Sequence, residues 1–571
     1  MQLNADIQKL ERQYLPKQFT VNSKEDVIPH FEELLARELK SIKDLKQWMQ
    51  DSSELEAALS EDVCWRQINM TRDTENKEYE ESFTNFVMNI EPHLKPFAHR
   101  LNEKLIASPF TKELEEEYDI MLRSVKNQVE LYREENITLE AEINVLAQQF
   151  GAISGKMSIE VDEKEFTLQQ AAKFLQQPDR SRREEVYFKV ANRRAKDREK
   201  LDELFDNLLE KRHQVALNAG FENYRDYMFK ALGRFDYGVK ECQDFHASVK
   251  KYMLPLVEKI YDSKKEKLGI DKLKPWDLNA VQEGQEPLSP FKDGQELTDK
   301  AIAVYDKLNP FFGNCIRKMK EIQHLDLDSR KGKAPGGYNC PLAETGVPFI
   351  FMNAAGTADD VITMMHEGGH AFHSFLAHDL KLSGMKEYPM EIAELASMSM
   401  ELFTFEHWDV FYEKQTDLKR AQAEQLERSL SIFPWIATID KFQHLIYTNP
   451  THTREERTTE WMNILNEFYP ANIDTDDLDT IRAIQWQKQL HLFEVPFYYI
   501  EYGIAQLGAI AMWKQYLNNE EQAIENYTKA LSLGYTKNLK ELYQRAGIQF
   551  DFSESTVKEL AEFVSERMQK L

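Results

Sequence analysis

Apolar residues recur at spacings of three and four along most of this chain, and that period constrains its fold more than any other feature. In "HFEELLARELKSIKDLKQWMQ" (30–50), one stripe is formed by Phe31, Leu34, Leu35, Leu39, Ile42 and Leu45. The period matches one face of an α-helix. Only 21 glycines and 19 prolines interrupt 571 residues, which disfavours turn-rich β structure. We therefore predict a mainly α fold.

Two stretches interrupt the helical period. "GAISGKMSIEVDEKEFTL" (151–168) alternates apolar and polar residues and predicts a short β-hairpin, after which Thr167 is a suitable N-cap for the next helix. Residues 273–297 contain three prolines and no period, so we expect a loop between lobes there. These breaks predict an N-terminal helical region at 1–150 and a larger region at 151–571 that carries the chemistry.

The best β candidate is "GGYNCPLAETGVPFIFMN" (336–353), in which two apolar stretches flank "AETG". The segment "VPFIFMN" is rich in strand-forming residues, and its Pro348 is tolerated only at an edge or at the start of a strand. We expect a small sheet here, with "VPFIFMN" at its edge, where an extended peptide could add as a further strand. An ordinary core hairpin is the alternative.

Charge, hydropathy and cysteine usage restrict the partners. The chain has 72 basic and 97 acidic residues, a net charge of −25, which argues against nucleic acid as a partner. It has no run of eighteen apolar residues, so we expect no membrane span, and the N-terminus lacks the plan of a signal peptide. We therefore expect a cytoplasmic protein. The four cysteines are far apart and form no C-x-x-C pair, so we expect reduced, mostly buried thiols at Cys64, Cys242, Cys315 and Cys340.

The stretch "TMMHEGGHAFHSFLAH" predicts a metal site on a helix. Thr357 and Asp360 resemble a capping box at the start of that helix. His366 and His370 are four residues apart, so both imidazoles project from one face, about 6 Å apart along the axis, and can reach one zinc ion. Glu367 lies beside the first ligand, where its carboxylate can accept a proton from a metal-bound water. This is the H-E-x-x-H arrangement.

A catalytic zinc site needs a third protein ligand. His373 is near in sequence, but it lies about 10.5 Å along a straight helix from the first histidine, too far to converge on one ion. The segment 389–408, "PMEIAELASMSMELFTFEHW", offers Glu391, Glu394 and Glu401 among apolar residues. We expect Glu394 to be the third ligand and Glu401 to hold a ligand imidazole. The alternative for each glutamate is a solvated helix face.

At this point the sequence resembles a known family, the thimet oligopeptidase and oligoendopeptidase F zinc metallopeptidases, and most closely the oligoendopeptidase F branch. The resemblance covers most of residues 150–571 and, more weakly, the N-terminal helices. It rests on "HEGGHAFH", "EIAELASMSME", "VPFIFMN", "GFENYRDYM" (220–228) and "HLFEVPFYYIEYGIAQ" (491–506). It implies an almost wholly helical, two-lobed bowl with a deep central channel, a small sheet beside the active-site helix, and short peptides as substrates.

The resemblance also implies roles for individual residues. His366 and His370 match the zinc histidines, Glu367 the general base and Glu394 the third ligand. In the downstream segment the family has a histidine and tyrosines that contact the substrate and the developing oxyanion. His491 and Tyr502 match that pattern, and the intermediate tyrosine is either Tyr498 or Tyr499. Gly368 follows the base where larger side chains are usual, and we expect it to add play around the site.

Both lines of reasoning predict a zinc-dependent endopeptidase with one Zn²⁺ per chain and oligopeptide substrates. Glu367 would take a proton from the metal-activated water and return it to the leaving amine, and Tyr502, assisted by His491, would stabilise the oxyanion. A catalytically inactive, zinc-containing helical binding protein is one alternative. A zinc carboxypeptidase on a related scaffold is another.

Overall fold

The computed structural model describes residues 3–9, 11–330, 332–334 and 336–571, and the architecture is mainly helical, as predicted. The first helices are α1 (Ile28–Ala36), α2 (Ile42–Arg72), α3 (Lys77–Asn85), α4 (Glu91–Ala107), α5 (Asp119–Leu131) and α6 (Asn136–Gly155). The next are α7 (Leu168–Ala171), α8 (Arg180–Ala195), α9 (Arg198–Asn218), α10 (Tyr224–Ala231), α11 (Val239–Ser248), α12 (Leu254–Leu268), α13 (Gly294–Leu308) and α14 (Pro310–Glu321). The remainder are α15 (Ala358–Leu376), α16 (Met390–Thr404), α17 (Gln415–Thr448), α18 (Arg454–Phe468), α19 (Asp479–Arg482), α20 (Leu490–Glu494), α21 (Tyr499–Asn518), α22 (Glu520–Leu531), α23 (Leu539–Arg545) and α24 (Glu554–Met568).

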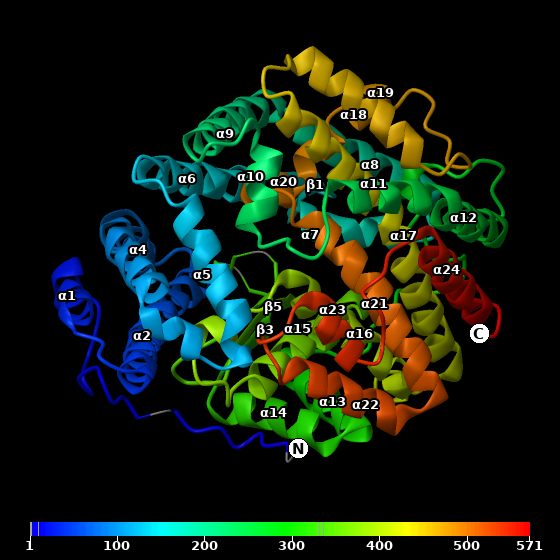
Figure 1. The fold of residues 1–571 in the computed structure, drawn as a ribbon. Helices are drawn as coiled ribbons and strands as arrows, with labels where there is room; N and C mark the ends of the chain where they lie inside the picture. The colour runs from blue at the N-terminus through cyan, green and yellow to red at the C-terminus, as the bar shows by residue number, and fades with distance from the viewer. Residues whose placement is uncertain (1–2, 10, 331, 335) are drawn as a thin grey trace.

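The helices after α5 form two groups, which lie one above the other in Figure 1. Helices α8, α9, α11, α12 and α18 belong to the upper group, and α13, α14, α15, α16 and α22 belong to the lower one. Helices α17 and α21, which pack against each other, connect the groups. Helix α17 packs against α10, α11, α12 and α18, and α21 packs against α16, α17 and α22. Residues from both groups therefore share one continuous hydrophobic core.

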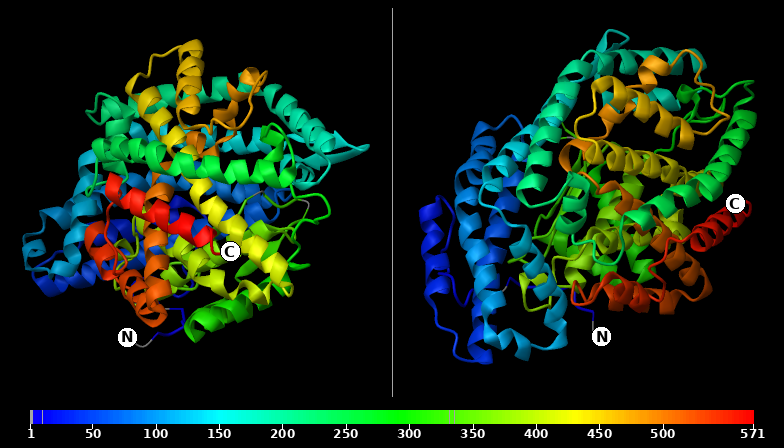
Figure 2. Two further views of the ribbon diagram at one scale, coloured as in Figure 1. Left: turned by 90° about the vertical axis from the view of Figure 1, so that its right-hand side faces the viewer. Right: turned by 45° about the horizontal axis from the view of Figure 1, so that its top comes forward.

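The N-terminal helices form a layer along one side of the molecule (Figure 2) and have a core of their own. Leu382 and Met385, from the segment between α15 and α16, close that core. The apolar stripe predicted at 31–45 is divided between α1 and α2. Residues 37–41 separate the two helices, and the last of them, Ser41, is extended and accepts a hydrogen bond from the Asp44 amide (3.2 Å) as the N-cap of α2.

The predicted hairpin is present. Strands β1 (Ser158–Val161) and β2 (Lys164–Thr167) pair antiparallel, with Ile159 opposite Phe166. Thr167 then caps α7 through a capping box with Gln170, which confirms the N-cap prediction.

The second sheet differs from its prediction in the place of one strand. It contains β3 (Leu325–Asp328), β4 (Tyr338–Cys340) and β5 (Phe349–Ala354), in the order β3-β5-β4. The expectation that "VPFIFMN" forms an edge is wrong, because β5 pairs in parallel with β3 and antiparallel with β4. The edge strand that contacts the helix α15 is β4.

Three of the four cysteines are buried, and all four are free thiols, as expected from their spacing. Among the described helices, none combines the length and the apolar character that crossing a bilayer requires.

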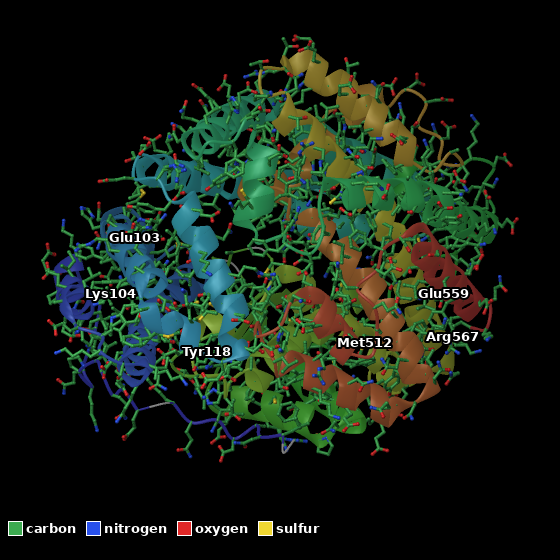
Figure 3. All side chains as sticks on the ribbon, viewed as in Figure 1. Glu103, Lys104, Tyr118, Met512, Glu559 and Arg567 are labelled. Atoms are coloured by element: carbon green, nitrogen blue, oxygen red, sulfur yellow. The ribbon has the colours of Figure 1, made fainter. Side chains whose placement is uncertain are left out.

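The ammonium group of Lys104, labelled on α4 in Figure 3, closes the end of α1. Its Nζ donates to the carbonyls of Leu34, Leu35 and Arg37 at 2.8, 2.8 and 2.5 Å. The last carbonyls of a helix have no partner within it and carry the negative end of its dipole, so a cation there is stabilising. One side chain of α4 thus anchors the outermost helix of the N-terminal layer.

Lys104→Met is expected to speed hydrogen exchange of the α1 amides by roughly tenfold, because hydrogen bonds from a charged donor contribute about 1.5–3 kcal/mol. Exchange measured by mass spectrometry on a peptide from α1 tests this. The control is Lys95→Met on the same helix, which removes a half-exposed ion pair to Glu140 (3.0 Å) and leaves α1 untouched. Equal α1 exchange rates in the two variants would contradict the anchoring role.

Candidate active site

The predicted helix over the H-E-x-x-H segment is α15. Thr357 and Asp360 form the capping box that begins this helix. Asp359 adds a second negative charge in the first turn, where it interacts favourably with the positive end of the helix dipole. One turn separates His366 from His370, and their rings meet edge to face with centroids 4.9 Å apart. The two imidazoles therefore project from one face of the helix, as the spacing predicts.

Two glycines let α15 lie very close to its neighbours. A Cβ on Gly369 would stand 2.5 Å from Ser397 Cα and 2.6 Å from the Ala396 oxygen, both backbone atoms of α16. A Cβ on Gly368 would overlap the hydroxyl of Tyr305, which donates to the Met364 carbonyl (2.9 Å). The expectation that Gly368 adds play around the site is wrong, because the buried phenol of Tyr305 occupies the space that a side chain would take.

Helix α16 brings Glu394 to the two histidines. Its Oε2 lies 3.3 Å from His366 Nε2 and 3.9 Å from His370 Nε2, and the ligand atoms of the three residues all lie within 4.8 Å of one another. Burial raises the pKa of Glu394, but hydrogen bonding to His366 and the charge of His370 lower it further, to about 2. The carboxylate is therefore held ionised in the interior.

Glu401 lies behind the first histidine. Its Oε1 is 2.7 Å from His366 Nδ1, and its Oε2 accepts from Gln425 Nε2 at 2.9 Å. Holding Nδ1 in this way fixes the ring and leaves Nε2 directed at Glu394. The sequence indicated Glu401 for this position but gave no signal for Gln425, which comes from α17.

Glu367 is 6% exposed, and its Oε2 has no hydrogen-bond partner among the described residues. Burial raises its pKa, the charge of His366 lowers it, and Glu394 and Glu401 raise it further, so that the pKa is about 7. A carboxylate with that pKa exchanges protons readily near neutral pH.

His373 lies apart from this cluster. It is fully buried, and its ring stacks on Tyr388 with centroids 3.5 Å apart. Burial lowers its pKa well below the ordinary value. His373 is therefore a packed core residue, in agreement with the helix geometry that excluded it as a zinc ligand.

The downstream histidine and tyrosines lie on α20 and at the start of α21. Tyr498 Oη donates to Glu394 Oε1 at 2.6 Å, and His491 Nε2 lies 3.4 Å from Tyr502 Oη. Burial lowers the pKa of His491 to about 4, so the imidazole is neutral. Tyr499 packs edge to face against the His491 ring, with centroids 4.8 Å apart, but its hydroxyl makes no hydrogen bond to Glu394 among the described residues. Of the two candidate intermediate tyrosines, the structure brings Tyr498 to the cluster.

Two buried arginines hold this tyrosine segment in place. Arg212 donates to Tyr447 and to two carbonyls of α20, one of them at 2.9 Å. Arg234 donates to the Phe497 carbonyl and to Glu501 Oε1 (2.9 Å). Phe497 has a φ of +67°, a strained conformation for a residue with a side chain. No sequence signal pointed to either arginine, because both act on main-chain oxygens more than 250 residues away.

Two adjoining cavities lie beside the cluster, and the smaller one opens onto it. The smaller has a volume of about 190 Å³ and is lined by His366, Glu401, His491 and Tyr502 among others. The larger, of about 480 Å³, extends past the start of α15 between α12 and α17. Both cavities have Arg428 in their walls.

The donor set of the cluster fits a zinc ion. Two imidazole nitrogens and one carboxylate oxygen are ligands that Zn²⁺ prefers, and three protein ligands with space beside them are typical of catalytic rather than structural sites. The unpartnered oxygen of Glu367 is an independent sign, because a buried carboxylate oxygen is normally hydrogen-bonded.

Comparison with known proteins defines the family. The model of "Peptidase family M3" matches residues 173–562, and that of "Peptidase M3 N-terminal domain" matches residues 18–132. The chain therefore belongs to peptidase family M3.

The relatives confirm the resemblance to the oligoendopeptidase F branch. An oligoendopeptidase F homologue of Borreliella burgdorferi is 23% identical over 64% of this chain, and the oligopeptidase PepF of Bacillus subtilis is 22% identical over 60%. The chain spans 61% and 55% of the length of these two curated relatives. The solved structure of Pz peptidase A with an inhibitor is 27% identical, covers 97% of this chain and 98% of that chain, and has a TM-score of 0.92.

Gly369→Ala is expected to lower the melting temperature by several degrees and to weaken metal binding, because the added methyl group forces the backbones of α15 and α16 apart. Calorimetry and elemental analysis of the purified protein measure both effects. Gly151→Ala is the matched control, since it is also helical but its Cβ would meet nothing within 4 Å. It should be neutral or stabilising by up to about 1 kcal/mol. A Gly369→Ala protein as stable as the control would contradict the close crossing.

Proposed function

We propose that this protein is a zinc-dependent endopeptidase that hydrolyses internal bonds of oligopeptides. One observation carries the proposal, the convergence of His366, His370 and Glu394 beside the buried carboxylate of Glu367. Membership of peptidase family M3 supports it independently.

The three converging residues would hold one Zn²⁺ per chain, and Glu367 would move the proton. A zinc ion bound there supplies Lewis-acid activation of a water molecule and of the scissile carbonyl. Glu367 takes the proton of the attacking water and passes it to the leaving amine, a task suited to its pKa of about 7. Burial of the carboxylate keeps that proton from escaping to bulk water.

Phenol and imidazole groups would stabilise the charge that develops on the substrate oxygen. Tyr502 and His491 line the smaller cavity and are neutral donors at working pH, because burial raises the pKa of the phenol and lowers that of the imidazole. Preorganised donors of this kind typically contribute a factor of about 10²–10³ to the rate. Tyr498 instead orients Glu394 through the 2.6 Å hydrogen bond.

An extended peptide would reach the site along the edge strand β4. This strand contacts α15, and Asn339 Nδ2 lies 3.5 Å from the Glu367 carbonyl. Main-chain hydrogen bonds at a sheet edge do not depend on the side chains of the peptide, so a broad range of oligopeptides could bind. The role that the sequence suggested for "VPFIFMN" thus passes to the neighbouring strand.

Product mapping by mass spectrometry on a series of peptides of increasing length tests the proposal. An endopeptidase yields internal fragments from peptides with an amidated C-terminus, and a chelator abolishes the cleavage. If the enzyme released only single C-terminal residues, and amidation of the C-terminus stopped this release, the zinc carboxypeptidase would be indicated. Bound zinc without any cleavage would indicate the inactive binding protein.

Glu367→Gln is expected to retain zinc and to lose at least about 10³-fold in kcat, since the amide keeps the shape of the side chain but cannot accept the proton. Elemental analysis and turnover of a quenched peptide give the two values. Glu406→Gln, a glutamate on the segment after α16, is the control with full activity. Turnover by Glu367→Gln within a few-fold of the parent would remove Glu367 as the base.

Tyr502→Phe is expected to lower kcat by about 10²-fold with little change in KM, because its hydroxyl acts on charge that develops only in the transition state. Tyr499→Phe is the neighbouring comparison: Tyr499 lines the same cavity, but its hydroxyl makes no hydrogen bond to His491 or Glu394 among the described residues, so this change should lower kcat less than Tyr502→Phe does. A change in KM alone for Tyr502→Phe would make that residue a substrate-binding group only.

A further inference from the structure

A second cluster of metal-ligating side chains lies where α11 meets α17, outside the site described above. The sequence "CQDFH" places Cys242 and His246 one turn apart on α11, and "DKFQH" places Asp440 and His444 one turn apart on α17. The two helices are in contact, and α17 runs between the two groups of helices (Figure 1). Each helix thus presents a pair of ligand types at the i, i+4 spacing that allows two side chains to reach one ion.

The side chains converge. The ligand atoms of Cys242, Asp440 and His444 all lie within 4.8 Å of one another. His444 Nε2 is 3.2 Å from Asp440 Oδ2, and His246 Nε2 is 2.8 Å from the same oxygen. In a tetrahedral zinc site, bonds of about 2.0–2.3 Å place neighbouring ligand atoms roughly 3.3–3.6 Å apart. The distances in the α15–α16 cluster, 3.3 and 3.9 Å, bracket that range, and those at Asp440 need to open by less than about 0.6 Å to enter it.

The cluster is buried, and some of its polar atoms lack a hydrogen-bond partner. Cys242 and Asp440 are 0% exposed and His444 is 8% exposed. Asp440 Oδ1 and His444 Nδ1 have no hydrogen-bond partner among the described residues. Buried polar atoms without partners cost free energy and are rare in folded proteins, so their presence at converging ligands points to a missing partner.

We propose that Cys242, Asp440 and His444 bind a second divalent ion of the zinc class, with His246 orienting the Asp440 carboxylate. A thiolate and a carboxylate together offset the two positive charges of Zn²⁺ in the core. A thiol must lose its proton to bind the ion, so binding releases the Cys242 proton to water.

This ion would brace the segment that carries the active-site tyrosines. Gln443, between the two α17 ligands, accepts a hydrogen bond from the strained Phe497 amide (2.6 Å). The His444 ring meets the Phe497 ring edge to face, with centroids 5.6 Å apart. Fixing Asp440 and His444 therefore fixes two contacts of the residue that directly precedes Tyr498.

A cavity adjoins the cluster. A cavity of about 610 Å³ is lined by both histidines, together with Arg225, Lys441 and Glu467. The cavity reaches the histidine side of the cluster.

Cobalt titration of the metal-free protein tests the proposal, because a thiolate bound to Co²⁺ gives an intense near-ultraviolet charge-transfer band. The catalytic cluster offers only nitrogen and oxygen, so that band reports on the second site. We expect the band to reach the intensity of one thiolate-bound Co²⁺ per chain. It should persist in His366→Ala/His370→Ala and disappear when Zn²⁺ displaces the cobalt. Elemental analysis should show about two zinc ions per parent chain and about one in that double variant.

Variants of single cysteines locate the thiolate. Cys242→Ser should abolish the band and leave one zinc ion per chain, whereas Cys340→Ser, a buried cysteine in another core, should keep both. A band that survives Cys242→Ser, or no band in the parent protein at excess Co²⁺, would overturn the proposal and leave the cluster as a buried carboxylate hydrogen-bonded to imidazole. If Cys242→Ser fails to fold, His444→Ala supplies the same comparison.

Discussion

The close crossing of α15 and α16 is the constraint on which the rest of the site depends. Gly369 lets the two backbones approach to a distance that no side chain would permit, and this approach brings Glu394 within 3.3 Å of His366 Nε2. Two turns further along α16, Glu401 holds the other nitrogen of the same imidazole. Without the crossing, two buried carboxylates and two partly buried imidazoles would have no common partner, and the cost of burying them would be uncompensated.

Segments that are distant in sequence complete the site through main-chain contacts. Arg212 donates hydrogen bonds to carbonyls of α20, and Arg234 donates to the carbonyl of Phe497. The Phe497 amide in turn donates to Gln443 of α17. These bonds hold the tyrosine segment against α16 even though no side chain of the segment is itself a predicted metal ligand. Long-range polar contacts of this kind position groups to within the few tenths of an ångström that catalysis requires.

Local physics explains which features could be predicted from the sequence. The capping box at Thr357, the shared face of His366 and His370 and the exclusion of His373 all follow from helix geometry. The edge position of β4, by contrast, depends on β3, whose four residues "LDLD" carry almost no strand signal. The tight fit at Gly368 depends on Tyr305 from another helix. The choice between Tyr498 and Tyr499 depends on where the left-handed residue falls in the chain, and periodicity does not encode that.

The central claim is that one zinc ion lies between His366, His370 and Glu394. Anomalous diffraction recorded on both sides of the zinc absorption edge tests it most directly. The account predicts a peak about 2.0–2.2 Å from both Nε2 atoms and from a carboxylate oxygen of Glu394. A crystal grown with zinc that shows no peak at that point, or whose nearest peak lies beside His373, would contradict the account.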